Sequence, residues 1–142
     1  MKKQGSILIE VAASIVILTL ATTFIVSVSM KNMQVLKERI LLEEVNRDVW
    51  NVINEFKYNL TKEEIKEMLS DGKIGFKYSE DFSKKLLNMS PKELENGNEI
   101  EITKIGEDDI GIRFKVQTNI KNEKNEALIE QEFTKSWWMD EV

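Results

Sequence analysis

The sequence predicts an α+β protein in which one long N-terminal helix precedes a small antiparallel β-sheet. No glycine or proline occurs between Gly5 and Gly72, so no helix-breaking residue interrupts most of that stretch. Residues 11–30 are uncharged and mostly apolar, and this is the length of a membrane-spanning helix. In the last third, apolar side chains recur at every second residue, which is typical of strands with one buried face. A sheet of this kind needs a cover, and the helix is the obvious one.

Composition limits the function classes. The 142 residues allow one small domain beside the apolar segment. The 112 residues after Met30 contain 18 basic and 24 acidic side chains, so no broad positive field favours nucleic acid. The chain has no cysteine and no histidine, which excludes disulfides, thiolate metal sites and most nucleophile–histidine systems. We therefore expect no enzymatic activity, no catalytic residues, no metal site and no cofactor.

The long helix is expected to run from about Ser6 to about Tyr58, roughly 80 Å at 1.5 Å per residue. After the apolar run, residues at spacings of three and four, with one gap filled by Glu38, define an amphipathic stripe: Val35, Leu42, Val45, Val49, Val52 and Phe56, widened by Leu36, Ile40 and Ile53. This stripe is expected to cover the sheet of the same chain. A coiled-coil contact with a second chain is the alternative.

The region 59–97 gives weaker signals. Thr61 with Glu64 is a capping-box pair that predicts a short helix over Lys62–Leu69, ended by Asp71-Gly72. Alternation of Ile74, Phe76 and Tyr78 predicts one short strand, and residues 80–91 read as a weakly helical or irregular connection.

The last third predicts a β-meander over residues 98–138. Strands are expected around Ile100–Ile102, over Ile110–Ile120 and over Leu128–Trp138, with turns at Gly106–Asp109 and Asn122–Asn125. Adjacent Trp137 and Trp138 in a strand would place one indole inward and one outward, and the exposed indole could contact another subunit. The acidic Glu107–Asp109 lacks the ligand spacing of a calcium loop and is expected to be a solvated turn.

Glu10 is the most informative single residue. It is the only charged residue between Lys3 and Lys31, and a carboxylate in hydrocarbon costs several kcal/mol unless a partner neutralises it. Lys2 and Lys3 precede the apolar run and are expected to keep this end on the cytoplasmic side. The chain after Met30 is then expected outside a cell membrane that it crosses once.

The segment Gly5-Ser6-Ile7-Leu8-Ile9-Glu10, with basic residues before it and a long apolar helix after it, resembles the N-terminus of type IV pilins and pseudopilins. The resemblance covers about the first 30 residues, and the helix-then-sheet order agrees with the family over the rest. It implies a leader peptide at residues 1–5, a membrane and filament-core helix at 6–30, and an extracytoplasmic headpiece at 31–142. The headpiece would comprise a helix at 31–58, a variable region at 59–97 and the meander.

The resemblance also implies a mechanism of assembly. A prepilin peptidase would cut between Gly5 and Ser6 and methylate the new amine of Ser6. Glu10 would then pair with that amine on a neighbouring subunit, as the chain moves from membrane lipid into an extracellular filament. The implied partners are other pilin subunits, the peptidase and an inner-membrane assembly platform. Ser6 in place of phenylalanine, and an apolar helix without glycine or proline, favour a minor pilin or pseudopilin of a pilus, competence or secretion system.

Two other interpretations of the N-terminal segment stay open. The apolar run is also compatible with the signal segment of an ordinary secreted protein, because Ser27-Val28-Ser29 offers small residues for cleavage. It is equally compatible with a simple anchor of a surface binding domain.

Overall fold

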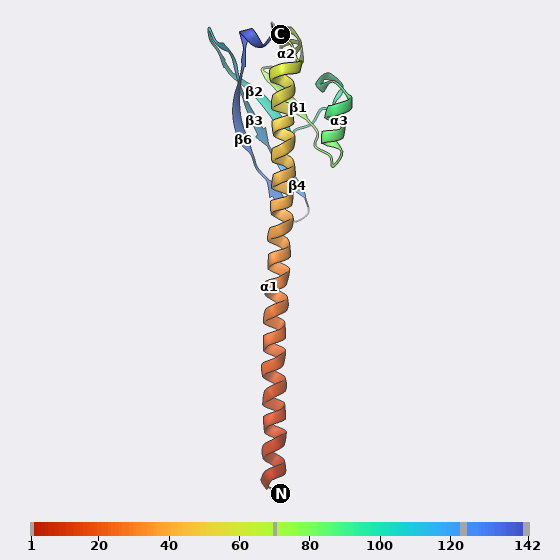
Figure 1. The fold of residues 1–142 in the computed structure, drawn as a ribbon, viewed down its shortest axis with the longest axis vertical. Helices are drawn as coiled ribbons and strands as arrows, with labels where there is room; N and C mark the ends of the chain where they lie inside the picture. The colour runs from red at the N-terminus through yellow and green to blue at the C-terminus, as the bar shows by residue number, and fades with distance from the viewer. Residues whose placement is uncertain (1, 70, 123–124, 141–142) are drawn as a thin grey trace. The chain divides into compact units, whose positions relative to one another are not determined.

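The computed structural model describes residues 2–69, 71–122 and 125–140. The chain divides into two compact units, and the division falls between Lys37 and Glu38. The predicted fold class is confirmed: a long N-terminal helix packs on a small antiparallel β-sheet (Figure 1).

Helix α1 runs over Lys2–Asn54 and provides all the described residues of the first unit. Every side chain from Gly5 to Lys37 is exposed, including long runs of valine, leucine and isoleucine. The helix is long and apolar enough to cross a membrane, judged by length and composition.

In the second unit, the last part of α1 buries one face against the sheet. Val45, Val49, Val52 and Phe56 recur at the predicted spacing and are fully buried. The ring of Phe56 meets Phe76 and Phe133 edge to face, with both centroid distances at 6.3 Å. The helix end is therefore the centre of a single apolar core.

The sheet has four antiparallel strands in the order β1-β2-β3-β6. These strands are β1 Lys73–Phe76, β2 Ile100–Glu107, β3 Gly111–Thr118 and β6 Glu130–Ser136. Strands β4 Ile120–Asn122 and β5 Asn125–Ala127 form a separate two-stranded sheet between β3 and β6. The three strands predicted for 98–138 pair antiparallel in chain order as β2, β3 and β6, and the β4–β5 hairpin was not predicted. The expected turn at 122–125 lies partly outside the described residues.

Short helices connect α1 to the sheet. A π-helical turn, η1 Glu55–Asn59, ends α1 and is followed by α2 Lys62–Met68. Both hydrogen bonds of the predicted capping box between Thr61 and Glu64 are present. The predicted Asp71-Gly72 turn follows, with φ of 53° and 78°, values that glycine adopts without strain.

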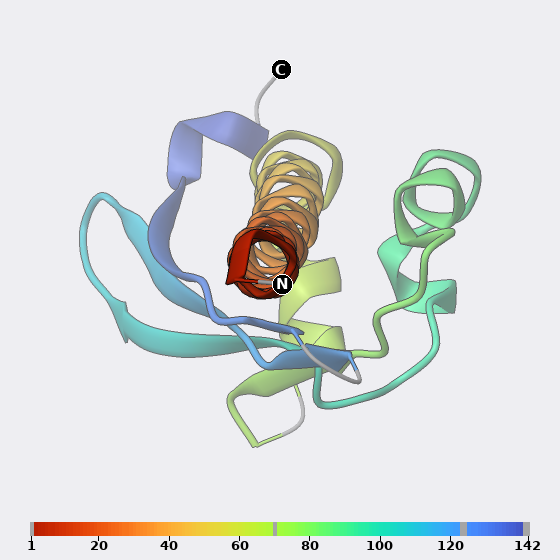
Figure 2. The same cartoon turned by 90° about the horizontal axis from the view of Figure 1, so that it is seen from below.

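Two further helical segments precede β2, namely α3 Phe82–Asn88 and η2 Pro91–Glu93. Within this unit the sheet curves along one side of α1, whereas α3 lies on a different side (Figure 2). Phe82 and Leu86 of α3 are buried in the same core.

The amphipathic stripe starts later than expected. Val35, Leu36 and Ile40 are 50, 57 and 47% exposed, and burial begins with the half-buried Leu41 and Leu42. Leu36 and Ile40 do not widen the buried face, because at 100° per residue they point roughly 150° away from Val45, Val49 and Val52. Spacings of three and four alone did not separate these two helical faces.

The strand ends also differ from expectation. Ile110 is 67% exposed in the β2–β3 turn, although it continues the alternation of β3. Thr118, the polar exception in that alternation, is buried; its hydroxyl donates to the carbonyl of Ala127 and accepts from the amide of Ile129. Trp137 and Trp138 do not extend β6. They begin the 3-10 helix η3 Trp137–Asp140, in which Trp137 is half-buried and Trp138 is 60% exposed.

A buried carboxylate ties α3 to α1. Asp48 is only 4% exposed and accepts a hydrogen bond from the hydroxyl of Ser83, and its negative charge acts on the half-buried phenol of Tyr78. Burial, together with the negative charge of Asp48, raises the pKa of Tyr78, so this phenol stays protonated. The interaction holds the connection between β1 and β2 against the helix.

We expect Asp48→Ala to lower the free energy of unfolding by about 2 kcal/mol, because the Ser83 hydroxyl loses its acceptor inside the protein. Urea unfolding of the full chain in detergent, followed by tryptophan fluorescence, measures this change. Asp81→Ala is the control, since Asp81 forms an exposed 3.5 Å ion pair with Lys84. Equal effects of the two substitutions would contradict the structural role of Asp48.

Candidate functional site

The residues expected to direct processing and assembly lie in the first turns of α1. Gly5, Ser6 and Glu10 are helical and exposed, and Lys2 and Lys3 belong to the same helix. Ser6 and Glu10 are four residues apart, so their side chains share one helical face. A Cβ atom at Gly5 would meet no atom within 4 Å, so local packing does not require glycine here. Any requirement for glycine at this position would come from a partner.

Five of the six hydroxyls within residues 11–30 are used within the helix, and Ser29 is the exception. Each serine and threonine between residues 11 and 28 donates to a backbone carbonyl four residues earlier, at 2.7–2.9 Å: Ser14, Thr19, Thr22, Thr23 and Ser27. These hydroxyls need no further acceptor, which lowers the cost of placing them in hydrocarbon. No ion pair involves Glu10 among the described residues. Its carboxylate is thus the charged side chain of this segment that still requires a partner.

A buried lysine lies at the other end of the chain. Lys135 of β6 is 1% exposed; its Nζ donates to the carbonyl of Lys57 at 2.6 Å and forms a 2.9 Å ion pair with Asp140. Asp140 also pairs with Lys62 at 3.4 Å, and the Lys62 ammonium lies 4.0 Å from the centroid of the Trp137 ring. These contacts join η1, α2, β6 and η3.

The electrostatics of this cluster favour the charged carboxylate. Burial opposes ionisation of Asp140, but hydrogen bonds and charge interactions with Lys135 and Lys62 outweigh it, so the pKa of Asp140 lies below its ordinary value. All donors and acceptors in the cluster belong to the protein itself. This arrangement is typical of a structural ion-pair network and leaves no group poised to attack a substrate.

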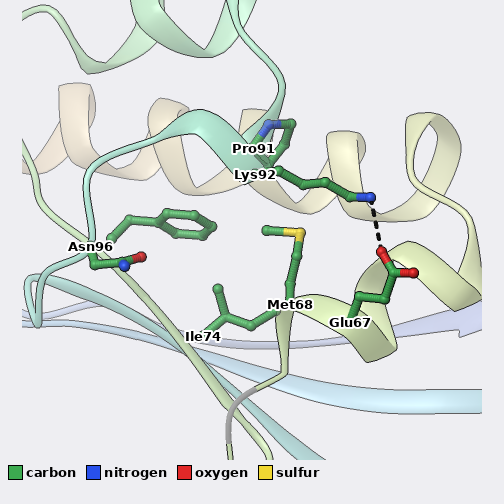
Figure 3. A pocket seen from close by; sticks show the side chains of 7 residues that line it. Glu67, Met68, Ile74, Pro91, Lys92 and Asn96 are labelled. Atoms are coloured by element: carbon green, nitrogen blue, oxygen red, sulfur yellow. Dashed lines mark hydrogen bonds and ion pairs between the residues drawn. The ribbon is translucent and has the colours of Figure 1, made fainter.

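A cavity of 310 Å³ opens between α2, β1 and η2 (Figure 3). Met68, Ile74, Phe76 and Pro91 form its apolar walls, and Glu67, Lys92 and Asn96 form its polar rim. Figure 3 shows the side chains of Met68 and Ile74 pointing toward the side of Pro91 and Lys92. The volume is at the lower end of the range for small-ligand sites.

Two carboxylates, one of them outside the lining, pair with the one ammonium at the rim of the cavity. The Lys92 ammonium is shared by Glu64 and Glu67, both at 3.3 Å, so two carboxylates face one cation. The hydrogen bond from the Thr61 amide, and then the contact with Lys92, lower the pKa of Glu64. Glu63 and Glu93, on the same two helical segments, are exposed and take part in no ion pair among the described residues.

Close backbone contact fixes the outer wall of the cavity. The segment after η2 runs along β1, with Gly97 donating to the carbonyl of Gly75 at 3.3 Å and Lys77 to that of Glu95 at 2.9 Å. A Cβ atom on Gly75 would lie 2.2 Å from the carbonyl oxygen of Gly97, so this approach requires glycine.

The acidic turn Glu107–Asp109 has a structural explanation. The Oδ1 atom of Asp108 accepts from the amides of Ile110 and Gly111, and its Oδ2 atom pairs with Arg113 at 3.6 Å. Among residues 2–69, 71–122 and 125–140, no group of three or more histidine, cysteine, aspartate or glutamate side chains is arranged to hold a metal ion.

Sequence reasoning did not identify Asp48, Lys135 or the cavity. Asp48 follows a buried position of the amphipathic stripe, and Lys135 falls on the inward register of β6 next to Phe133. A charged residue on the predicted buried side of a helix or strand was the sequence feature that could have indicated a buried polar contact. Their partners lie 35 and 78 residues away in the sequence, where local patterns give no indication.

We expect Asp140→Asn to lower the free energy of unfolding by about 3 kcal/mol, because it leaves a buried ammonium without its counter-charge. The depressed pKa means that Asp140 contributes stability above its ordinary pKa of 3.8, and that this contribution is lost as the pH falls through the lower, folded-state pKa. Urea unfolding between pH 7 and pH 2 should therefore show the two proteins converging at acid pH. A constant difference across this range would contradict the ionic contribution.

Comparison with known proteins identifies no relative: no protein-family model, no curated protein and no solved structure matches this chain.

Proposed function

We propose that the chain is a structural subunit of a type IV pilus-like filament, with the role of a minor pilin or pseudopilin. The observation that carries the proposal is the segment Gly5–Glu10, in which a single carboxylate precedes an apolar helix that can cross a membrane. The fold of the second unit supports this role without requiring it, because a small helix-covered sheet is a suitable headpiece. The headpiece would lie outside the membrane and, after assembly, on the filament surface.

The physical basis of the proposed assembly is the free-energy cost of holding the Glu10 carboxylate in hydrocarbon without a partner. Its carboxylate has no partner among the described residues, and an isolated carboxylate is expensive in hydrocarbon. Cleavage between Gly5 and Ser6 would create an amine of opposite charge. Pairing that amine with Glu10 of a neighbour would neutralise both groups and fix the axial position of one helix against the other.

The arrangement of the headpiece gives no support to an enzymatic role. Its buried charged groups, Asp48 and Lys135, are both held by partners within the chain. Membrane lipid before assembly and other subunits afterwards are therefore the proposed surroundings of the helix. The prepilin peptidase and an inner-membrane assembly platform are the proposed processing and assembly partners.

Mass spectrometry of the chain isolated from its native membrane tests the processing step. We expect an N-terminus at methylated Ser6, because the peptidase would cut after Gly5. A start near Met30 would instead indicate a secreted domain, and an intact Met1 would indicate a simple anchor. Either of these outcomes would refute the proposal.

We expect Glu10→Ala to leave membrane insertion and cleavage intact but to reduce incorporation into filaments by about tenfold, because the neighbouring amine loses its counter-charge. Quantifying the subunit in sheared filaments measures the effect. Ser14→Ala is the control, since it removes only a hydroxyl bonded to the carbonyl of Glu10. Normal incorporation of the Glu10 variant would eliminate the proposed pairing.

A further inference from the structure

The cavity between α2, β1 and η2 has the chemistry to hold a lysine side chain. Its walls are apolar over Met68, Ile74, Phe76 and Pro91, which suits a four-carbon stem. Its rim has Glu67 and Lys92, and Glu64 beside the rim shares the same Lys92 ammonium, with both carboxylates at 3.3 Å. Exposed Glu63 lies four residues before Glu67 and thus on the same face of α2. A second cation would balance this charge.

The first unit offers a matching surface. Met33 and Leu36 are 58 and 57% exposed, and Lys37 is exposed with no ion pair among the described residues. On an α-helix these three residues share one face, because they lie at positions i, i+3 and i+4. The face therefore combines an uncompensated cation with apolar side chains, which is the complement of the cavity.

We propose that the cavity of one chain binds the Met33–Lys37 face of a second copy of this chain. The Lys37 ammonium would lie at Glu67 and Glu63, while Met33 and Leu36 would cover the apolar walls around Met68 and Pro91. The contact joins two different surfaces, so it is heterologous and allows each copy to bind a further copy. The inference rests on the proposed assembly role and adds a headpiece contact to it.

Charge balance favours a second copy over lipid as the occupant. Anionic lipid headgroups would bring further negative charge to a rim whose one ammonium already pairs with two carboxylates. Lys37 supplies the missing positive charge together with an apolar contact surface. The neighbouring Val35 serves as an internal reference, because it is 50% exposed but points roughly 160° away from Met33.

Disulfide cross-linking tests the contact, since the natural chain contains no cysteine. One full-length chain would carry Met33→Cys and another Asn96→Cys, co-expressed in the membrane and mildly oxidised. We expect a cross-linked heterodimer, and a yield roughly fivefold lower when Val35→Cys replaces Met33→Cys. Equal yields from the two positions would overturn the proposal.

Charge reversal tests the role of Lys37. Lys37→Glu should lower the Met33–Asn96 cross-link yield by about fivefold, and Glu63→Lys in the partner chain should restore it. An unchanged yield with Lys37→Glu would contradict the proposal, provided that tryptophan fluorescence shows both chains folded. Absence of the cross-link together with protection of Met33→Cys from an impermeant maleimide, at every protein density, would place the Met33–Lys37 face in lipid and refute the contact.

The experiments can refute the proposed contact and the proposed pilin-like function independently of each other. Correct cleavage after Gly5 and normal filament incorporation without the Met33–Asn96 cross-link would refute this contact alone. The cross-link in a chain that is never cleaved would support the contact and refute the pilin-like role.

Discussion

Burial of one face of the α1 C-terminal part is the interaction on which the headpiece depends. Val45, Val49, Val52 and Phe56 are completely buried, and Phe56 contacts aromatic rings from both edge strands, β1 and β6. A four-stranded sheet with one apolar face is not stable without such a cover. The short helices α2 and α3 also direct Ile65, Phe82 and Leu86 into this core.

Buried polar contacts then determine how the irregular segments dock on that core. Asp48 fixes α3, and Lys135 with Asp140 fixes the C-terminal 3-10 helix to the end of α1. Each charge is satisfied within the chain, as the low dielectric of the interior demands. Hydrophobic burial alone would tolerate several placements of these short helices, whereas a buried ion pair or hydrogen bond permits few.

Local signals predicted the elements whose causes are local. The Thr61–Glu64 capping box, the Asp71-Gly72 turn and the alternation in β2 and β3 were all recognisable in the sequence. The end of β3 at Gly111 was missed because the Asp108 side chain caps the turn, and alternation continues through Ile110. The cavity was missed because its walls come from three segments, brought together by the contact between Gly75 and Gly97. The roles of Gly5, Ser6 and Glu10 come from a resemblance and stay predictions.

The internal hydrogen bonding of the apolar segment has a mechanical consequence. The hydroxyls of five residues in this segment donate to their own backbone, so these donors are not available to a neighbouring helix: Ser14, Thr19, Thr22, Thr23 and Ser27. Apolar surfaces attract without preferring a particular axial offset. In the proposed filament, these hydroxyl donors would therefore contribute little to the choice of axial offset between neighbouring helices. The proposed pairing of Glu10 with a neighbouring amine would then be the main directional contact that fixes this offset.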